Sequence, residues 1–463
     1  MKLSSLARYM RLRPFDVSTE QGRSDERYRL ALWSVVANLL SKCITMLVMV
    51  FSVSWTLPYL GAERFGVWMT IASFVGMLVF LDLGTGNALT NQVAKAATQE
   101  KRLDVTNAIS GGLGLLFLLG ILAGSLLAVV IATLPWASII KVRNPAIGDE
   151  IQLSLFLFAF LFGINLFSTG VHRVFAGLQR SFEAHVATAL GSVVSLAALW
   201  WAARNEAGIP ALVLATLGCQ SISGFLLLIL LKSRGLFRLH GIHAAVRTER
   251  NSLLRVGGLF FVLQIGTMVG WGADSLIIAS TLGAAQVAIY SVTQRLFQFV
   301  VQPLSMVNAP LWSAYADAHA RGDKEFIFKT LKRSLILTAS LTALGGGILF
   351  ALSPQLIEWW TKGTISVPLL FVLTYFVWIF CETLGNALAM MMNGCGIVRE
   401  QVFTVLMLTI LALPIKLISL NYFGIVGMLA SYIVLYCAVV LPLYGFYFRN
   451  SLIRRIGKNE RNL

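Results

Sequence analysis

The sequence has 463 residues, of which 57% are hydrophobic and only 13% are charged. Soluble domains carry about 25% charged residues, so this composition excludes an ordinary soluble protein and indicates a membrane protein. The net charge of +16 would suggest nucleic acid as the partner of a soluble protein. Here membrane topology accounts for most of that charge, and we expect no nucleic-acid partner.

The first 30 residues are basic but lack the apolar run and cleavage site of a signal peptide, so we expect no processing of 1–30. Apolar stretches of about 20 residues follow, each long enough to cross a hydrocarbon core of about 30 Å. The twelve predicted spans are 31–57, 65–88, 108–134, 151–174, 182–203, 209–231, 254–281, 286–311, 334–356, 367–391, 401–421 and 425–448. The predicted fold class is therefore an all-α polytopic membrane protein with about 12 transmembrane helices.

The basic residues fall mainly on one side of these spans. The N-terminal tail, the even-numbered loops and the C-terminal tail, together with Arg173 and Arg255 at the cytoplasmic edges of their spans, hold 29 of the 37 Lys and Arg residues. Because Lys and Arg accumulate in cytoplasmic loops, this pattern predicts that both termini are cytoplasmic.

A polar segment in the middle of the chain separates two sets of six spans. We interpret 232–253 as a cytoplasmic linker between an N-terminal bundle, 31–231, and a C-terminal bundle, 254–448, and 449–463 as a basic cytoplasmic tail. The sequence "LGAERFGVW" at 60–68 returns as "LGAAQVAIY" at 282–290, a register of 222 residues.

Six spans separate these copies, an even number, so the repeats enter the membrane in the same direction. Parallel repeats with a binding site at their interface are typical of transporters. A scaffold or a channel built by duplication is the alternative.

Ionisable side chains inside spans are costly and normally face a bundle interior or water. Lys42 lies about 11 residues into the first span, roughly 17 Å by helical rise, which is near the midplane and predicts a functional role. Asp274 and Arg295 lie at similar depth in the seventh and eighth spans, where they could pair. The sequence leaves open whether such a pair would be structural or part of a pathway.

Three further charges lie inside spans. Asp82, near the cytoplasmic end of the second span, is a candidate for gating or ion coupling, with a solvated helix end as the alternative. Glu382, about midway along the tenth span, could carry or relay a proton. Lys416 is about six residues from the outer end of the eleventh span, so we expect it to snorkel to the interface as an anchor.

Motifs for nucleotide hydrolysis, metal binding and nucleophilic catalysis are missing from the sequence. There is no GxxxxGK[ST] or HExxH pattern, and the five cysteines and five histidines show no ligand or disulfide spacing. We therefore expect no metal, no cofactor and no enzymatic activity. A membrane glycan polymerase or ligase remains the less favoured alternative.

Several stretches resemble bacterial polysaccharide-repeat-unit flippases of the multidrug/oligosaccharidyl-lipid/polysaccharide exporter superfamily. They are "LPYLGAERFGVWMTIASFVGMLVFLDLGTGNALTNQVAKA" (57–96), "RVFAGLQRSFEAH" (173–185), "GADSLIIASTLGAAQVAIYSVTQRLF" (272–297) and "PLWSAYADAHARGDKEF" (310–326). The resemblance extends over the whole chain in length, span count and loop order.

The resemblance implies two parallel-related six-helix bundles around a central cavity, in a bacterial cytoplasmic (inner) membrane. It implies a substrate, an undecaprenyl-diphosphate-linked oligosaccharide, that is carried to the external leaflet by alternating access for O-antigen, capsule or exopolysaccharide synthesis. Lys42 and Arg295 would then contact the diphosphate, and Asp274 would orient Arg295 or exchange a proton, with Asp82 and Glu382 as secondary candidates.

Proton or sodium is the expected coupling ion, and other polysaccharide-assembly membrane proteins are candidate partners. An ion-coupled small-molecule exporter of the same superfamily is the runner-up. An exporter of cations would need a cavity with net negative charge. A direct binding test with organic cations separates the two.

Overall fold

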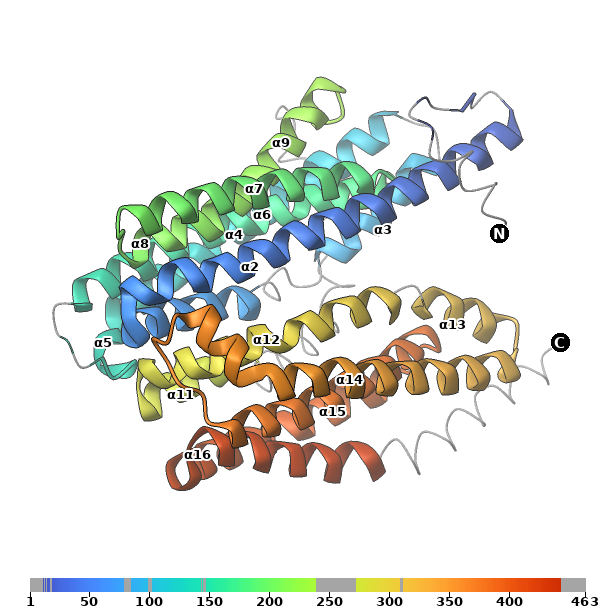
Figure 1. The fold of residues 1–463 in the computed structure, drawn as a ribbon. Helices are drawn as coiled ribbons and strands as arrows, with labels where there is room; N and C mark the ends of the chain where they lie inside the picture. Colours follow the sequence, from blue (N-terminus) through green and yellow to red (C-terminus); the bar gives the residue numbers. More distant parts are fainter. Residues whose placement is uncertain are drawn as a thin grey trace. The chain divides into compact units, whose positions relative to one another are not determined.

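A computed structural model describes most of the chain, and every element in the described residues is helical (Figure 1). The described residues are 11, 13, 15–16, 19–78, 85–98, 102–142, 144, 147–238, 272–308 and 311–442. The chain divides into two compact units. The N-terminal unit comprises Met1–Leu60, Phe74–Ser138 and Asn144–Phe261, and the C-terminal unit comprises Gly61–Ser73, Ile139–Arg143 and Val262–Leu463.

The helices in the first half are α2 (Glu20–Leu78), α3 (Thr85–Thr98), α4 (Arg102–Thr133), α5 (Trp136–Ile139), α6 (Gly148–Gly177), α7 (Ser181–Arg204), α8 (Ile209–Val213), the π-helical turn η3 (Leu214–Gly218) and α9 (Cys219–Ser233). The helices in the second half are α11 (Asp274–Leu282), α12 (Ala284–Asn308), α13 (Leu311–Ala320), α14 (Lys324–Thr361), α15 (Leu369–Gly394) and α16 (Val398–Pro442).

Two of these helices contain a glycine at which the chain turns. Gly61 in α2 has φ 70° and ψ 173°, and Gly424 in α16 has φ 64° and ψ −161°. A residue with a Cβ rarely adopts these angles, which explains glycine at both turns. Each label therefore covers one predicted span and the larger part of a second: 31–57 and residues 65–78 of 65–88 in α2, and 401–421 and residues 425–442 of 425–448 in α16.

Eight helices in the described part of the chain are long and apolar enough to cross a membrane. With α2 and α16 each holding all or most of two predicted spans, these helices correspond to ten of the twelve. The more polar α12 coincides with the predicted eighth span, 286–311, whereas most of the seventh, 254–281, lies outside the described residues. The chain is a multi-pass, all-α membrane protein.

The N-terminal unit packs through small residues. α4 and α6 meet where a Cβ on Gly120 would lie 2.5 Å from the Gly163 carbonyl oxygen, and one on Gly124 would lie 3.0 Å from that of Ala159. Gly120 and Gly124 form a GxxxG pattern, which allows helix backbones to approach closely in a membrane. This close approach fixes α6 against α4, and α6 also packs against α9.

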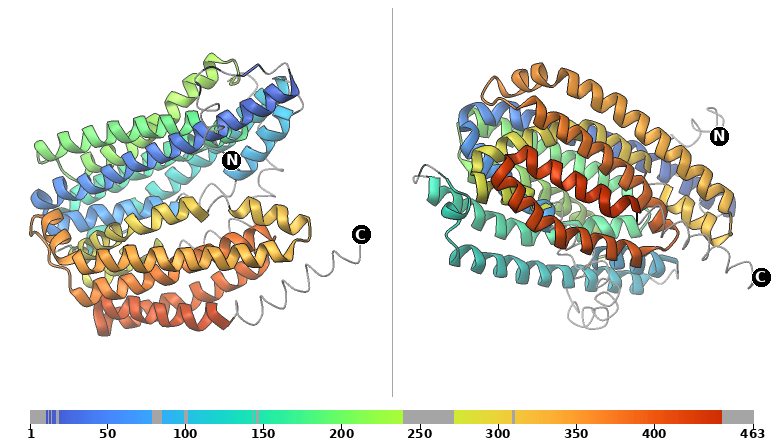
Figure 2. Two further views of the ribbon diagram at one scale, coloured as in Figure 1. Left: turned by 45° about the vertical axis from the view of Figure 1, so that its right-hand side comes forward. Right: turned by 90° about the horizontal axis from the view of Figure 1, so that it is seen from below.

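The C-terminal unit packs through aromatic rings. α14 and α15 lie side by side (Figure 2), and the Phe376 ring on α15 stacks on Phe297 of α12 and Phe350 of α14. Tyr375, one residue earlier, stacks on Phe297 at 5.6 Å and meets Tyr290 edge-on at 5.9 Å. These rings hold α12 against α15 and surround the polar groups described next.

Candidate functional site

A buried ion pair joins the start of α11 to the middle of α16. Lys416 Nζ lies 2.6 Å from Asp274 Oδ1, and the whole residues are 1% and 6% exposed respectively. Charges are tolerated inside a membrane protein when they pair within the bundle. The pair therefore ties two helices that are distant in sequence within the C-terminal unit.

Two tyrosines complete the surroundings of this pair. The Tyr290 hydroxyl of α12 donates to Asp274 Oδ2 at 2.9 Å, so both carboxylate oxygens are hydrogen-bonded. The Lys416 ammonium lies 3.9 Å from the centroid of the Tyr432 ring, which is within cation–π range. A charge pair whose remaining hydrogen-bonding capacity is satisfied recovers much of its desolvation cost.

A second carboxyl group lies near the ion pair. Glu382 on α15 is half-buried, interacts with the Trp378 side chain one turn earlier, and is close enough to Asp274 for electrostatic repulsion. The same two carboxylates act on Tyr290 and Tyr375. The C-terminal unit thus gathers two acids and one lysine, from α11, α15 and α16, among aromatic rings. We call Asp274, Tyr290, Glu382, Lys416 and Tyr432 the polar cluster.

Arg295 has other surroundings. Its guanidinium lies 5.9 Å from the ring centroid of Trp68, which belongs to the segment of α2 in the C-terminal unit. Trp68 is 1% exposed, and its indole nitrogen has no hydrogen-bond partner within the described part of the chain. The Trp68 ring therefore contributes a cation–π contact to Arg295.

Lys42 belongs to the N-terminal unit. It lies on α2, is half-buried, and is close enough to His185 of α7 to act on its charge. Three residues later the Thr45 and Ser192 hydroxyls approach to 3.3 Å, which links α2 to α7. The structure thus places Lys42 one helical turn from a polar contact between α2 and α7.

The pairing expected between Asp274 and Arg295 is wrong. Asp274 Oδ1 accepts from Lys416 and Oδ2 from Tyr290. Lys416 is also no interfacial anchor, because it is almost fully buried. The sequence contained one indication of the Lys416–Asp274 pair, since the two residues lie at comparable distances from the outer ends of their spans. Depth alone does not say which of several helices are neighbours.

The remaining expected residues are separated or untested. Arg295 and the polar cluster belong to the C-terminal unit, whereas Lys42 belongs to the N-terminal unit. Asp82 lies outside the described residues. Within the described part of the chain, no group of three or more His, Cys, Asp or Glu residues is arranged to hold a metal ion.

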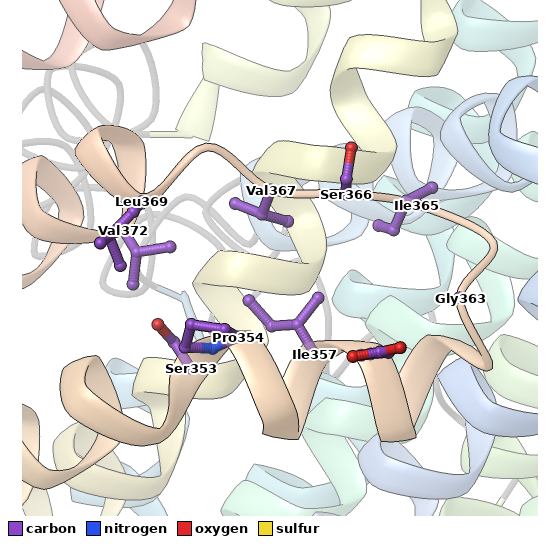
Figure 3. Close-up of a pocket in the computed structure, with 10 residues that line it drawn as sticks. Ser353, Pro354, Ile357, Gly363, Ile365, Ser366, Val367, Leu369 and Val372 are labelled. Atoms are coloured by element: carbon purple, nitrogen blue, oxygen red, sulfur yellow. The ribbon is translucent and has the colours of Figure 1, made fainter.

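A small pocket of about 290 Å³ lies where the α14–α15 connection folds back over the last turns of α14 (Figure 3). Val367 faces Pro354 and Ile357 across it, whereas the Ser366 hydroxyl points away. Glu358 is the one charged residue of its lining. The pocket shares no lining residue with the polar cluster, so the two are separate features of the C-terminal unit.

Comparison with known proteins gives two sequence matches. The family described as "Polysaccharide biosynthesis protein" matches residues 28–314. A putative O-antigen export protein of Yersinia pseudotuberculosis is 20% identical over 428 residues, which cover 91% of this chain and 96% of that protein.

Solved structures share the fold. The inward-facing form of a multidrug resistance MATE family transporter of the MOP superfamily has a TM-score of 0.75 at 14% identity, covering 91% of this chain and 99% of that one. An outward-facing form has a TM-score of 0.68 at 14% identity, covering 93% and 96%. A MOP superfamily transporter from Pyrococcus furiosus has a TM-score of 0.62 at 14% identity, covering 93% and 97%.

Proposed function

Because the chain belongs to the polysaccharide biosynthesis protein family, we propose that it flips an undecaprenyl-diphosphate-linked oligosaccharide from the cytoplasmic to the external leaflet of a bacterial inner membrane. The observation that carries this proposal is the match to a putative O-antigen export protein over 91% of the chain. The multi-pass helical fold, shared with transporters, supports it. The product would be a surface polysaccharide such as O-antigen, capsule or exopolysaccharide.

The physical problem of such transport is the polar head of the substrate. A diphosphate and its sugars cannot cross hydrocarbon unaided, because burying an uncompensated charge is prohibitively costly. Lys42 and Arg295 are the basic residues that we assign to the diphosphate. Since the Asp274 carboxylate binds Lys416 and Tyr290, Asp274 does not neutralise Arg295.

The polar cluster is our candidate for ion coupling. Protonation of Asp274 would weaken its attraction to Lys416, and the contact between α11 and α16 would change with the proton gradient. Glu382, close enough to Asp274 to repel it, is the second group that a proton or sodium ion could neutralise. Asp82 remains an expectation from the sequence alone.

Translocation in proteoliposomes tests the proposal. Purified protein is reconstituted with a fluorescent undecaprenyl-diphosphate oligosaccharide, and movement between leaflets is followed with and without an imposed proton gradient. We expect protein-dependent movement of a covalently unchanged substrate, faster under the gradient. Absence of movement by folded protein across several glycans would overturn the flippase assignment.

Glu382→Gln tests the coupling separately. This variant removes the ionisable group at nearly constant size, so we expect it to fold and to lose the gradient-dependent part of the rate. Glu358→Gln, in the pocket of Figure 3, is the matched control and should keep that part. A Glu382→Gln variant with the full gradient response would remove Glu382 from the coupling role while leaving the flippase proposal intact.

An ion-coupled small-molecule exporter is the second candidate. It is favoured by the two acids of the polar cluster, since cationic substrates need negative charge in their path. Binding of organic cations, measured by calorimetry on the purified protein, would support it if Asp274→Asn and Glu382→Gln abolished binding. Lack of binding, together with oligosaccharide movement, supports the flippase.

A further inference from the structure

A long apolar groove lies in the N-terminal unit, between α4, α6 and α9. Its volume is about 860 Å³, and it runs along α4 from Leu113 to Ala128, about 22 Å at the rise of an α-helix. Phenylalanines from the three helices line it, among them Phe117, Phe160 and Phe225. The groove is therefore longer than the depth of one leaflet, about 15 Å.

The close approach of α4 and α6 gives the groove its floor. Gly120 and Gly163 line the groove and are also the residues at which the two backbones meet. No side chain projects into the groove at these positions, while Phe117 and Phe160 stand as walls, 52% and 66% exposed. A narrow channel with aromatic walls and a glycine floor matches the shape of a linear hydrocarbon chain.

One end of the groove carries its single charged lining residue, Lys232, in the last turn of α9. Arg234, two residues later, is held by Glu183 through hydrogen bonds of 2.8 and 3.0 Å. Lys232 is exposed and has no ion pair among the described residues. The predicted topology places this end at the cytoplasmic surface.

We propose that this groove binds an anionic glycerophospholipid with one acyl chain along α4 and α6 and its phosphodiester at Lys232. The groove offers one positive charge, which matches a singly charged headgroup such as that of phosphatidylglycerol. A diphosphate lipid would leave negative charge uncompensated at the edge of the hydrocarbon. Moving an acyl chain from the bilayer into the groove gains no hydrophobic free energy, because both surroundings are apolar. The preference of the groove for this lipid therefore comes from close packing and from the contact between the headgroup and Lys232.

This lipid site goes beyond the proposed function and does not depend on it. Each bound lipid would contact three helices, α4, α6 and α9, and would stabilise their arrangement without taking part in transport. Its test is a binding measurement, so its outcome is independent of whether oligosaccharide moves.

The experiment measures immobilised lipid by electron spin resonance. The full-length protein is reconstituted in phosphatidylcholine with trace spin-labelled phosphatidylglycerol or spin-labelled phosphatidylcholine. We expect an excess of immobilised phosphatidylglycerol, and Lys232→Gln should lower that excess about five-fold. Lys332→Gln, on an exposed lysine of α14 in the other unit, should leave it unchanged.

A second variant tests the groove itself. Ser125 lines the groove from an exposed position on α4, so Ser125→Trp should fill it and reduce the immobilised fraction of both labelled lipids. No phosphatidylglycerol excess in the wild type, or an excess retained in Lys232→Gln, would overturn the proposal. So would an equal loss in Lys332→Gln, which would indicate diffuse surface charge. Displacement of the labelled lipid by equimolar undecaprenyl phosphate would overturn the assigned occupant.

Discussion

In the N-terminal unit, hydroxyls and one imidazole make polar contacts between spanning helices. His172 Nε2 lies 2.9 Å from Ser223 Oγ, and Thr45 approaches Ser192. In the C-terminal unit, an ammonium and a carboxylate meet at 2.6 Å inside the bundle. Among the described residues, only the second unit uses a fully buried pair of opposite charges.

The predicted repeat allows corresponding positions of the two units to be compared. In the 222-residue register, Asp274 corresponds to Ser52, which is 2% exposed and donates to the Met49 carbonyl within its own helix. Two spans of similar hydropathy thus differ at this position. Ser52 finds its hydrogen-bond partner within its own helix, whereas Asp274 needs a partner that is distant in sequence. Under the predicted duplication, the two spans keep a similar length while their polar residues differ in partner and role.

The largest test of this contrast is Lys416→Met. Removing the lysine leaves Asp274 without its counter-charge, and breaking a buried pair costs about 3–5 kcal/mol of folding stability. Thermal unfolding in detergent measures the loss. In the N-terminal unit, Ser52→Ala should cost only about 1 kcal/mol, the net value of one hydrogen bond.

A double variant tests whether the stability lost in Lys416→Met comes from the unpaired charge of Asp274. Asp274→Leu combined with Lys416→Met should recover most of the stability lost by Lys416→Met, because a neutral apolar pair replaces two charges. We expect it to lose the gradient response of transport. A Lys416→Met protein as stable as the wild type would show that the pair does not hold α11 to α16.

Substitution of glycine should destabilise the N-terminal unit more than the C-terminal unit, the reverse of the expected effect of removing a buried polar group. Gly120→Ala places a Cβ 2.5 Å from the Gly163 carbonyl oxygen in the N-terminal unit, which should cost about 1–3 kcal/mol. Gly347→Ala in α14 meets nothing within 4 Å and should stabilise the helix by about 0.5–1 kcal/mol. Unfolding temperatures that shift alike in the two variants would contradict the packing difference.

Lys42→Ala should change stability little, within about 0.5 kcal/mol, because the side chain is only half-buried. Loss of the proposed diphosphate contact should nevertheless lower translocation in proteoliposomes, whereas Lys42→Arg should retain much of it. Full translocation by a folded Lys42→Ala protein would remove its assigned role. The comparison with Lys416 distinguishes a substrate contact from a structural charge.

The ends of the two units also differ. In the N-terminal unit, Glu183 in the first turn of α7 pairs with Arg234 at the end of α9, whereas Tyr315 and Cys395 in the C-terminal unit belong to an apolar cluster. Burial raises the pKa of the Cys395 thiol to about 11 and that of the Tyr315 hydroxyl to about 12. A variant with Cys395 as its single cysteine should react slowly with N-ethylmaleimide at pH 8 and rapidly once denatured.

The raised pKa of Cys395 determines how the folding stability of the protein changes with pH. The folded state favours the protonated thiol, so its contribution to stability is complete below the unfolded pKa of about 8.5 and is lost as pH rises towards about 11. Equal labelling rates in native and denatured protein would show that the thiol is accessible and unperturbed.

The sequence by itself determined the membrane class and the lengths of most spans. These properties are local, since about twenty apolar residues suffice to cross the hydrocarbon core. It also identified Asp274, Glu382 and Lys416 as charges that need an explanation. Hydropathy does not encode which helices are neighbours, so the expected Asp274–Arg295 pair followed chain order.

Only the tertiary structure decided that α16 packs against α11 and presents Lys416 to Asp274. It also decided that α4 and α6 approach closely enough at Gly120 and Gly163 to leave a groove ending at Lys232. In both cases the outcome depends on lateral packing between helices distant in sequence. The cost of an unpaired charge or a misplaced Cβ is incurred only when the helices meet.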